Sequence, residues 1–222
     1  MNATTRPDTA EPAAVPGRYF LRFPGSWWNL DLDPSTRDAA IRRRLLEGLE
    51  PSRPGQPLDR ETAELADALV RSARKAARQA HARGALQLAG IFELFDGAPL
   101  IASTMVFRVS PPKDTEAALC DLLVAYAVRN AGLPHGRGTR ANGAEFIELP
   151  LAGPAGRVTS VEDVDFYGRG WVRMAIMQTV VPIPGTRDFL VVASTTPNLT
   201  LRDEFFTVFD AIAETLFFTG GE

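Results

Sequence analysis

Histidine and cysteine, two residue types that often carry catalysis or bind metals, are scarce in this chain of 222 residues. Its two histidines, His81 and His135, lie 54 positions apart and show no metal-ligand spacing. The single cysteine, Cys120, excludes an internal disulfide and a zinc site built from cysteines alone. There is no Gly-x-Ser-x-Gly elbow for a nucleophile, although a triad assembled in space leaves no such signature. We therefore predict no catalytic, metal-binding or cofactor-binding residue and expect a protein that is not an enzyme. An enzyme built from scattered polar residues remains an alternative.

Basic residues recur at helical spacing in a helix predicted from about Asp59 to Arg83. Four of them stand at i, i+3, i+4 and i+7, namely Arg71, Arg74, Lys75 and Arg78. Residues at this spacing share one face of a helix, so they form a basic stripe. Such a stripe suits an acidic protein partner or anionic lipid head groups. The alternative is a solvated helix whose acidic start and basic end complement its macrodipole.

A glycine-rich segment, residues 133–143 (LPHGRGTRANG), is predicted to be a polar loop with two arginines, Arg137 and Arg140. Glycines let backbone amides approach an anion, and arginine binds anions in a bidentate way. The segment contains only Gly-x-Gly and follows a predicted helix, so it matches neither nucleotide-binding fingerprint. We keep anion binding by Gly136–Arg140 as a hypothesis, with a solvated loop as the alternative.

Trp27 and Trp28 are candidates for partner contact, because tryptophan is common both in protein cores and at binding hot spots. Alternation along a strand puts the two side chains on opposite faces. We expect Trp28 to lie in the core and Trp27 to be partly exposed. Trp27 is therefore added to the candidate partner-binding residues.

Composition limits the classes of protein to which the chain can belong. The net charge of −3 argues against general nucleic-acid binding, which usually requires a basic surface. A hydrophobic content of 45% in this length supports one domain, expected at residues 17–219 after a disordered tail at residues 1–16. No apolar run approaches the roughly 20 residues of a membrane-spanning helix, and the first residues lack a signal-peptide pattern. We expect a cytoplasmic protein.

The elements that must position these residues come in groups. Strands are predicted at residues 18–23, 27–32, 85–95, 100–109, 146–151, 157–164, 171–181 and 189–196, and helices at residues 34–49, 59–83, 114–132 and 200–218. Asp33 is expected to cap the first helix, and Asp96-Gly97 is a strong hairpin signal. Helices grouped between hairpins predict the α+β class, with helices packed on a largely antiparallel sheet.

The chain ends in two apolar strands and one amphipathic helix. A turn at Pro182–Gly185 is expected to join the strands as antiparallel neighbours. The second strand, apolar on both faces in its first half, is expected to lie centrally in the sheet. Thr200 is expected to cap the helix with Asp203 as its capping-box partner. Phenylalanines at helical spacing, with Phe217 as the last, should cover the sheet.

This order of elements resembles the PsbP-like fold, which includes a Ran-binding nuclear import factor and many bacterial proteins. Three stretches carry the resemblance: FPGSWWNLDLD at residues 23–33, the hairpin around Asp96-Gly97, and FLVVASTTPNLTLRDEFFTVFDAIAETL at residues 189–216. In the last of these, Ser194–Pro197 and Phe209–Ile212 match the motifs of the last strand and last helix of such proteins. The resemblance covers about residues 18–218. It implies an αβα sandwich with a non-enzymatic binding or assembly role, and it supplies no catalytic residue. The chain lacks the lipid-attachment cysteine of the lipoprotein members.

These observations predict a non-enzymatic interaction module, a scaffold or chaperone-like adaptor in a bacterial protein complex, with a protein partner of unknown identity. The alternative is a small-ligand or lipid-binding domain with a pocket between the sheet and the C-terminal helix. A homodimer formed through the first strand or the strand of Phe146 also remains open, because an antiparallel sheet can have an unprotected edge.

Overall fold

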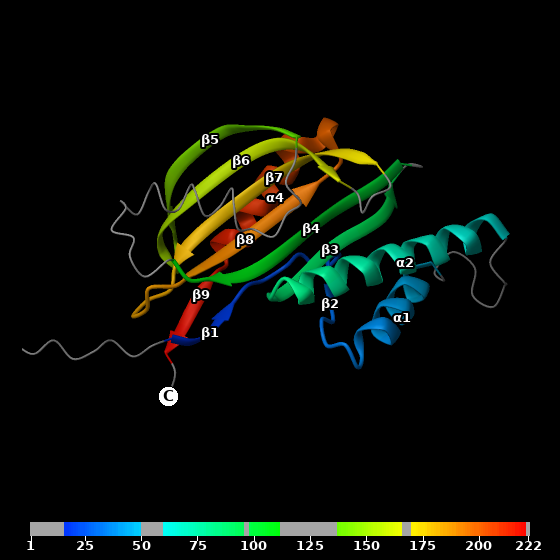
Figure 1. Ribbon diagram of the computed structural model, residues 1–222, viewed down its shortest axis with the longest axis horizontal. Helices are drawn as coiled ribbons and strands as arrows, with labels where there is room; N and C mark the ends of the chain where they lie inside the picture. Colours follow the sequence, from blue (N-terminus) through cyan, green and yellow to red (C-terminus); the bar gives the residue numbers. More distant parts are fainter. Residues whose placement is uncertain (1–15, 50–59, 96–97, 112–136, 166–169, 221–222) are drawn as a thin grey trace, which may run out of the picture.

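The computed structural model describes residues 16–49, 60–95, 98–111, 137–165 and 170–220. Its strands are β1 (Pro16–Phe20), β2 (Trp28–Leu30), β3 (Ala85–Phe95), β4 (Ala98–Val109), β5 (Arg137–Leu149), β6 (Gly153–Asp165), β7 (Trp171–Pro182), β8 (Phe189–Thr196) and β9 (Phe217–Gly220). Its helices are α1 (Arg37–Leu49), α2 (Arg60–Ala82) and α4 (Arg202–Glu214), the last preceded by the 3-10 turn η1 (Leu199–Leu201). Seven strands form one antiparallel sheet in the order β2-β3-β4-β8-β7-β6-β5, and β1 pairs with β9 separately (Figure 1). The α+β class with a largely antiparallel sheet is confirmed.

The central strands follow the sequence prediction closely. β3 and β4 pair from Ala85 to Phe95, and Phe95 stands opposite Ala98 across the predicted turn. β8 pairs with β7 on one side and β4 on the other, and all its residues are buried. A strand that lies centrally in a sheet is buried on both faces and therefore tends to be apolar on both. This pattern is the basis for predicting a central position for β8.

The two faces of the sheet are covered by different helices. Leu88 and Ala89 are neighbours in β3 and therefore face opposite sides. Ala89 packs in a buried cluster with Phe209 and Ile212 of α4. Leu88 packs in a second buried cluster, whose α2 members are Val70, Ala77 and Ala80. The predicted position of the last helix across the sheet is confirmed.

The chain beyond α4 differs from the prediction. α4 ends at Glu214, and Phe217 belongs to β9, where it stands opposite Phe20 of β1 with ring centroids 4.9 Å apart. The Thr215 hydroxyl donates to the Ile212 carbonyl (2.7 Å) and accepts the Arg22 amide (2.9 Å), so the last turn binds the segment after β1. The predicted continuation of the helix to residue 218 is therefore wrong.

One of the two predicted helix caps is wrong, and the other holds with a later helix start. Leu201 holds the N-cap position of α4 and makes no side-chain capping bond, so the predicted Thr200–Asp203 capping box is wrong. Asp33 Oδ1 accepts the amide of Ser35 (2.8 Å), and the Asp33 carbonyl accepts the amide of Arg37 (2.8 Å). Asp33 thus makes the two hydrogen bonds of an N-cap, as predicted, although regular α1 starts at Arg37 rather than at Pro34.

Other predictions fall outside the described residues. The helix at residues 114–132, which includes Cys120, is one of them. His135 is another, and so is the tail at residues 1–16 except for Pro16, which belongs to β1. The hairpin of β5 and β6 is confirmed, with Gly153 at φ +81° as the first residue of β6, directly after the turn. A positive φ of this kind favours glycine, because other residues meet a steric cost there.

Candidate functional site

The predicted partner-binding residues do not meet at one place. The basic stripe lies on α2, which packs beside β3 near one edge of the sheet (Figure 1). Arg137 and Arg140 lie in β5, which is the strand at the other end of the described sheet order. Trp27 is 7% exposed. The α2 stripe is therefore a candidate site separate from the other predicted residues.

Asp38 of α1 binds two of the stripe's arginines. The Arg74 guanidinium donates from Nε (3.0 Å) and Nη2 (2.6 Å) to the Asp38 carbonyl oxygen. Arg78 Nη1 lies 3.6 Å from the Asp38 carboxylate, which also accepts Nε of the buried Arg37 at 2.9 Å. These contacts hold α1 and α2 together. The guanidinium of Arg74 is therefore engaged in intramolecular hydrogen bonds and is less available to a partner. No local sequence pattern predicts this pairing, because Asp38 and Arg74 are 36 positions apart.

Asp38 remains ionised at neutral pH. The hydrogen bond from Arg37 lowers its pKa below the usual value, helped by the positive charges of Arg37, Arg78 and Arg74 and opposed by partial desolvation. The side chains of Asp38 and Arg78 are 41% and 53% exposed, so water and salt screen this ion pair. The pair positions the helices more than it stabilises them.

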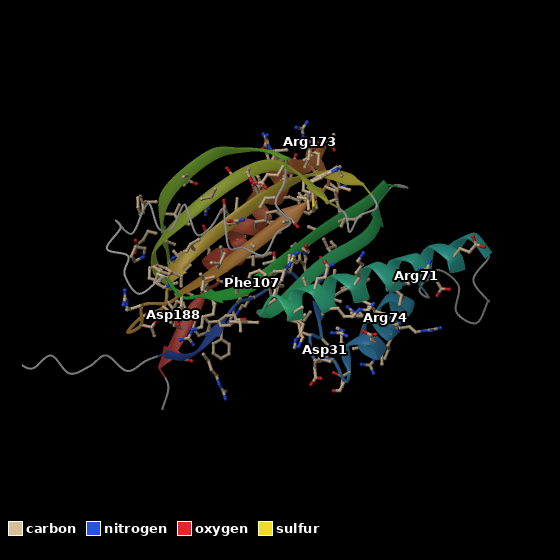
Figure 2. All side chains as sticks on the ribbon, viewed as in Figure 1. Asp31, Arg71, Arg74, Phe107, Arg173 and Asp188 are labelled. Carbon is tan, nitrogen blue, oxygen red and sulfur yellow. The ribbon has the colours of Figure 1, made fainter. Side chains whose placement is uncertain are left out.

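We give the name basic surface to the exposed arginines of α1 and α2 taken together, namely Arg42, Arg43, Arg44, Arg71 and Arg78. All five residues are exposed. The Arg44 guanidinium lies 5.8 Å from the centroid of the Trp28 ring, a cation–π distance. Figure 2 shows Arg71 and Arg74 on α2, away from Arg173 at the far part of the sheet.

Charge is unevenly distributed between these helices and the rest of the chain. α1 and α2 together contain nine Lys and Arg residues against five Asp and Glu residues, a formal charge of +4. The whole chain has a net charge of −3, so everything outside the two helices sums to −7. This helix pair is thus a local positive region in an acidic protein, which the overall charge conceals.

The expected exposure of Trp27 is wrong, and Trp28, expected in the core, is half-buried and packs against the core cluster on the α2 side of the sheet. The Trp27 amide donates to the Pro24 carbonyl (2.9 Å), which places Trp27 in a turn before β2 rather than in the strand. Its ring stacks on Phe23 (5.9 Å) and meets Phe209 edge-on (6.3 Å). Trp28 is the half-buried residue of the pair. Trp27 is therefore a core residue and is not accessible to a partner.

The glycine-rich segment also differs from its prediction. Residues 137–143 belong to β5 and pair with β6, with register shifts between Arg137 and Arg140 and between Ala141 and Gly143. The predicted loop over residues 133–143 is therefore wrong from Arg137 onward. Anion binding by Arg137 and Arg140 stays a prediction, without the loop geometry that motivated it.

A second charged group lies between β5, β6 and α4. Arg157 is 14% exposed at its side chain and forms ion pairs with Asp210 and, at 3.3 Å, with Glu145. Burial raises the pKa of Asp210, and the positive charge of Arg157 opposes that rise. Arg157 Nε is buried without a hydrogen-bond partner. These residues join three elements at the margin of the α4 interface, which is a structural role.

Other kinds of site find little support in the described residues. Among them there is no group of three or more His, Cys, Asp or Glu residues placed to hold a metal ion. No helix described by the structure is long and apolar enough to cross a membrane. The space between the sheet and α4 is occupied by Phe205, Phe209 and Ile212, which does not favour the alternative of a ligand pocket there.

No protein-family model matches the chain, and neither does any curated protein. Among solved structures, the chain is similar to LpqN, a Mycobacterium tuberculosis protein involved in cell envelope biogenesis. The match has 14% sequence identity and a TM-score of 0.45, and it covers 95% of this chain and 87% of that chain. A match with this sequence identity and TM-score shows neither the family nor the function of this chain.

Proposed function

We propose that this protein is a non-enzymatic interaction module, a scaffold or adaptor that binds an acidic protein partner through the basic surface of α1 and α2. One observation carries the proposal. Asp38 holds Arg74 and Arg78 against α1, so two helices present exposed arginines as one unit with a formal charge of +4. The PsbP-like resemblance supports the same role, because characterised members of that family are binding or assembly factors. A cytoplasmic location is part of the proposal, and cell fractionation tests it.

An acidic protein fits this surface better than a lipid membrane does. Helices that lie in a membrane interface combine basic residues with exposed apolar anchors. The exposed large apolar side chains of the described residues lie elsewhere: Phe20, Leu86, Phe146, Leu151, Trp171, Leu199 and Leu201. Arginine forks, in contrast, match carboxylates with two parallel hydrogen bonds. The described side chains of α1 and α2 thus favour carboxylates presented by a protein.

The experiment is quantitative capture of partners from the native host with the full chain and two variants. Arg42→Glu combined with Arg71→Glu reverses two exposed charges of the basic surface. Arg173→Glu is the control, a single charge reversal at a side chain that is 64% exposed beside Asp163 on a different part of the sheet. We expect an acidic protein that binds the wild type and Arg173→Glu, and whose affinity falls at least about tenfold in the double variant. Raising the ionic strength should weaken the same complex.

Two results would overturn the proposal. The first is a partner that the double variant and the wild type capture equally. The second is sedimentation of the wild type with phosphatidylserine vesicles, lost in the double variant, because it would assign the basic surface to a membrane. Melting curves of both variants provide the check on folding, since surface substitutions of this kind usually change stability by less than about 0.5 kcal/mol.

A further inference from the structure

The two ends of the seven-stranded sheet differ in length. β2 has three residues, and α1 packs beside it. β5 has 13 residues, and within the described part of the chain it pairs with β6 alone. A strand at a sheet edge presents a row of backbone N–H and C=O groups to which another strand can add. β5 is thus the long open edge of the described sheet.

The charges of β5 are ordered along the strand. Its first half contains Arg137 and Arg140, and its second half contains Glu145 and Glu148. When two copies of one strand pair antiparallel about a two-fold axis, the first half of each lies against the second half of the other. Opposite charges then meet on both sides of the axis, whereas parallel pairing would bring like charges together. β5 is therefore complementary to itself in the antiparallel arrangement.

A two-fold axis at Gly143 sets a consistent register for this pairing, because Asn142 is the extra residue of the register shift between Ala141 and Gly143. It places Arg140 opposite the partner's Glu145 and, by symmetry, Glu145 opposite the partner's Arg140. Along β6, Arg140 stands opposite Val161 and Glu145 opposite Arg157. Val161 and Arg157 are four residues apart in a strand, so Arg140 and Glu145 hold positions on the same face of the sheet. Facing residues of an antiparallel pair share a face, as this register requires.

Two further features of β5 agree with a specific partner. Phe146, next to Glu145, is 61% exposed, and covering an aromatic ring of this size is favourable. The register shifts within residues 137–143 and the four charges protect the edge against unselective pairing. When a second copy of β5 pairs antiparallel with this edge, its charges run in the reverse order, so its glutamates lie along the arginines of the first copy.

We propose that this protein forms a two-fold symmetric dimer in which β5 of each copy pairs antiparallel with β5 of the other, so that one sheet runs through both copies. This interface lies at the edge opposite β2 and does not use the basic surface of α1 and α2. The dimer and the binding of an acidic partner are therefore separable, and each has its own charge variant.

Sedimentation equilibrium of the full chain tests the dimer. We expect the wild type to reach twice the chain mass of 24.1 kDa at about 100 μM. Arg140→Glu puts two like-charge pairs across the axis and should raise the dissociation constant at least about tenfold. Arg71→Glu makes the same charge change on α2 and should leave that constant unchanged. Glu145→Gln, which removes a charge without adding a like charge, should weaken the dimer less than Arg140→Glu.

Hydrogen exchange of the wild type provides a readout that depends on no variant. Exchange of the amides at residues 137–149 should slow as the protein concentration rises through the dimer range. A mass of 24.1 kDa throughout that range would overturn the proposal. So would a dimer whose concentration-dependent protection lies outside β5, or one that Arg140→Glu leaves as stable as the wild type.

Discussion

α4 lies against the sheet through large aromatic and aliphatic side chains, whereas α2 reaches it through small ones. Phe209 and Ile212 of α4 are 1% and 2% exposed and pack directly on strand residues. The α2 residues in the opposite cluster are Val70, Ala77 and Ala80. Burying a Phe or Ile side chain contributes roughly 1.5–3 kcal/mol, and an alanine buries much less area.

This difference in packing indicates different roles for α4 and for the pair α1 and α2. α4 packs its buried face on β7 and β8, and its exposed residues are acidic, polar or small: Asp203, Glu204, Thr207, Ala211 and Glu214. α1 and α2 pack closely on the other face, where Asp38 joins them to Arg74 and Arg78, and their outer sides carry the exposed arginines. Stability is therefore concentrated in α4, and the proposed binding role in α1 and α2.

The largest effect on stability is expected from Phe209→Ala. Phe209 contacts Trp27, Phe205 and Phe206, so its removal leaves a cavity that neighbouring rings fill only in part. The free energy of unfolding should fall by about 3–5 kcal/mol in urea titrations. Phe206→Ala on the same helix is the control, with a smaller loss because Phe206 is only half-buried. Equal losses for the two variants would contradict the packing described for α4.

A smaller loss is expected from Ala77→Leu. Ala77 is fully buried in the cluster that α2 forms with the sheet, and a larger side chain there must push the helix outward. Overpacking of this kind costs about 1–3 kcal/mol, which thermal or urea unfolding would detect. Ala82→Leu, at an exposed position of the same helix, should cost less than about 0.5 kcal/mol. If Ala77→Leu were as stable as the wild type, close packing of α2 would be refuted.

The smallest effects concern pH, and they have opposite signs in the two regions. The pKa of Asp210 is raised by burial, so its contribution to stability is present below the unfolded value of 3.8 and is lost as pH rises through the folded value. The pKa of Asp38 is lowered by the Arg37 hydrogen bond, so its contribution is present above 3.8 and is lost as pH falls through the folded value.

Urea unfolding between about pH 3 and about pH 7 checks these signs. Asp210→Asn should remove a gain in stability that the wild type shows on mild acidification. Asp38→Asn should remove a loss that the wild type shows at the acidic end. Identical pH profiles for the two variants would contradict the assignment of one carboxyl to a buried site and the other to an exposed cluster of arginines.

The parts of the fold that sequence predicted well are those with local signals. Asp96-Gly97 marked the hairpin of β3 and β4, and the apolar run of β8 marked a central strand. The pairing of Phe217 with Phe20 joins the two ends of the described chain, and no local pattern announces it. Long-range pairing of this kind depends on how the completed core places the chain ends.

The candidate site was predicted only in part. Helical spacing in the sequence predicted the basic stripe. The contacts of Asp38 with Arg74 and Arg78 depend on how α1 and α2 are placed relative to each other, which the sequence does not show. Trp27 and Trp28 lie on opposite faces, as alternation predicted, but the sequence did not show that α4 covers the face of Trp27. Arg137 and Arg140 were assigned to a loop because edge strands with glycines, bulges and charges lack the alternation that marks half-buried strands.

The most direct test of the proposed function is the hydrogen-exchange footprint of the captured acidic partner on the wild-type chain. Slower exchange should appear in residues 37–49 and 60–82, which form α1 and α2, while residues 202–214 of α4 exchange as in the free protein. A footprint confined to α4 or to β5, with α1 and α2 unchanged, would contradict the assignment of partner binding to the basic surface.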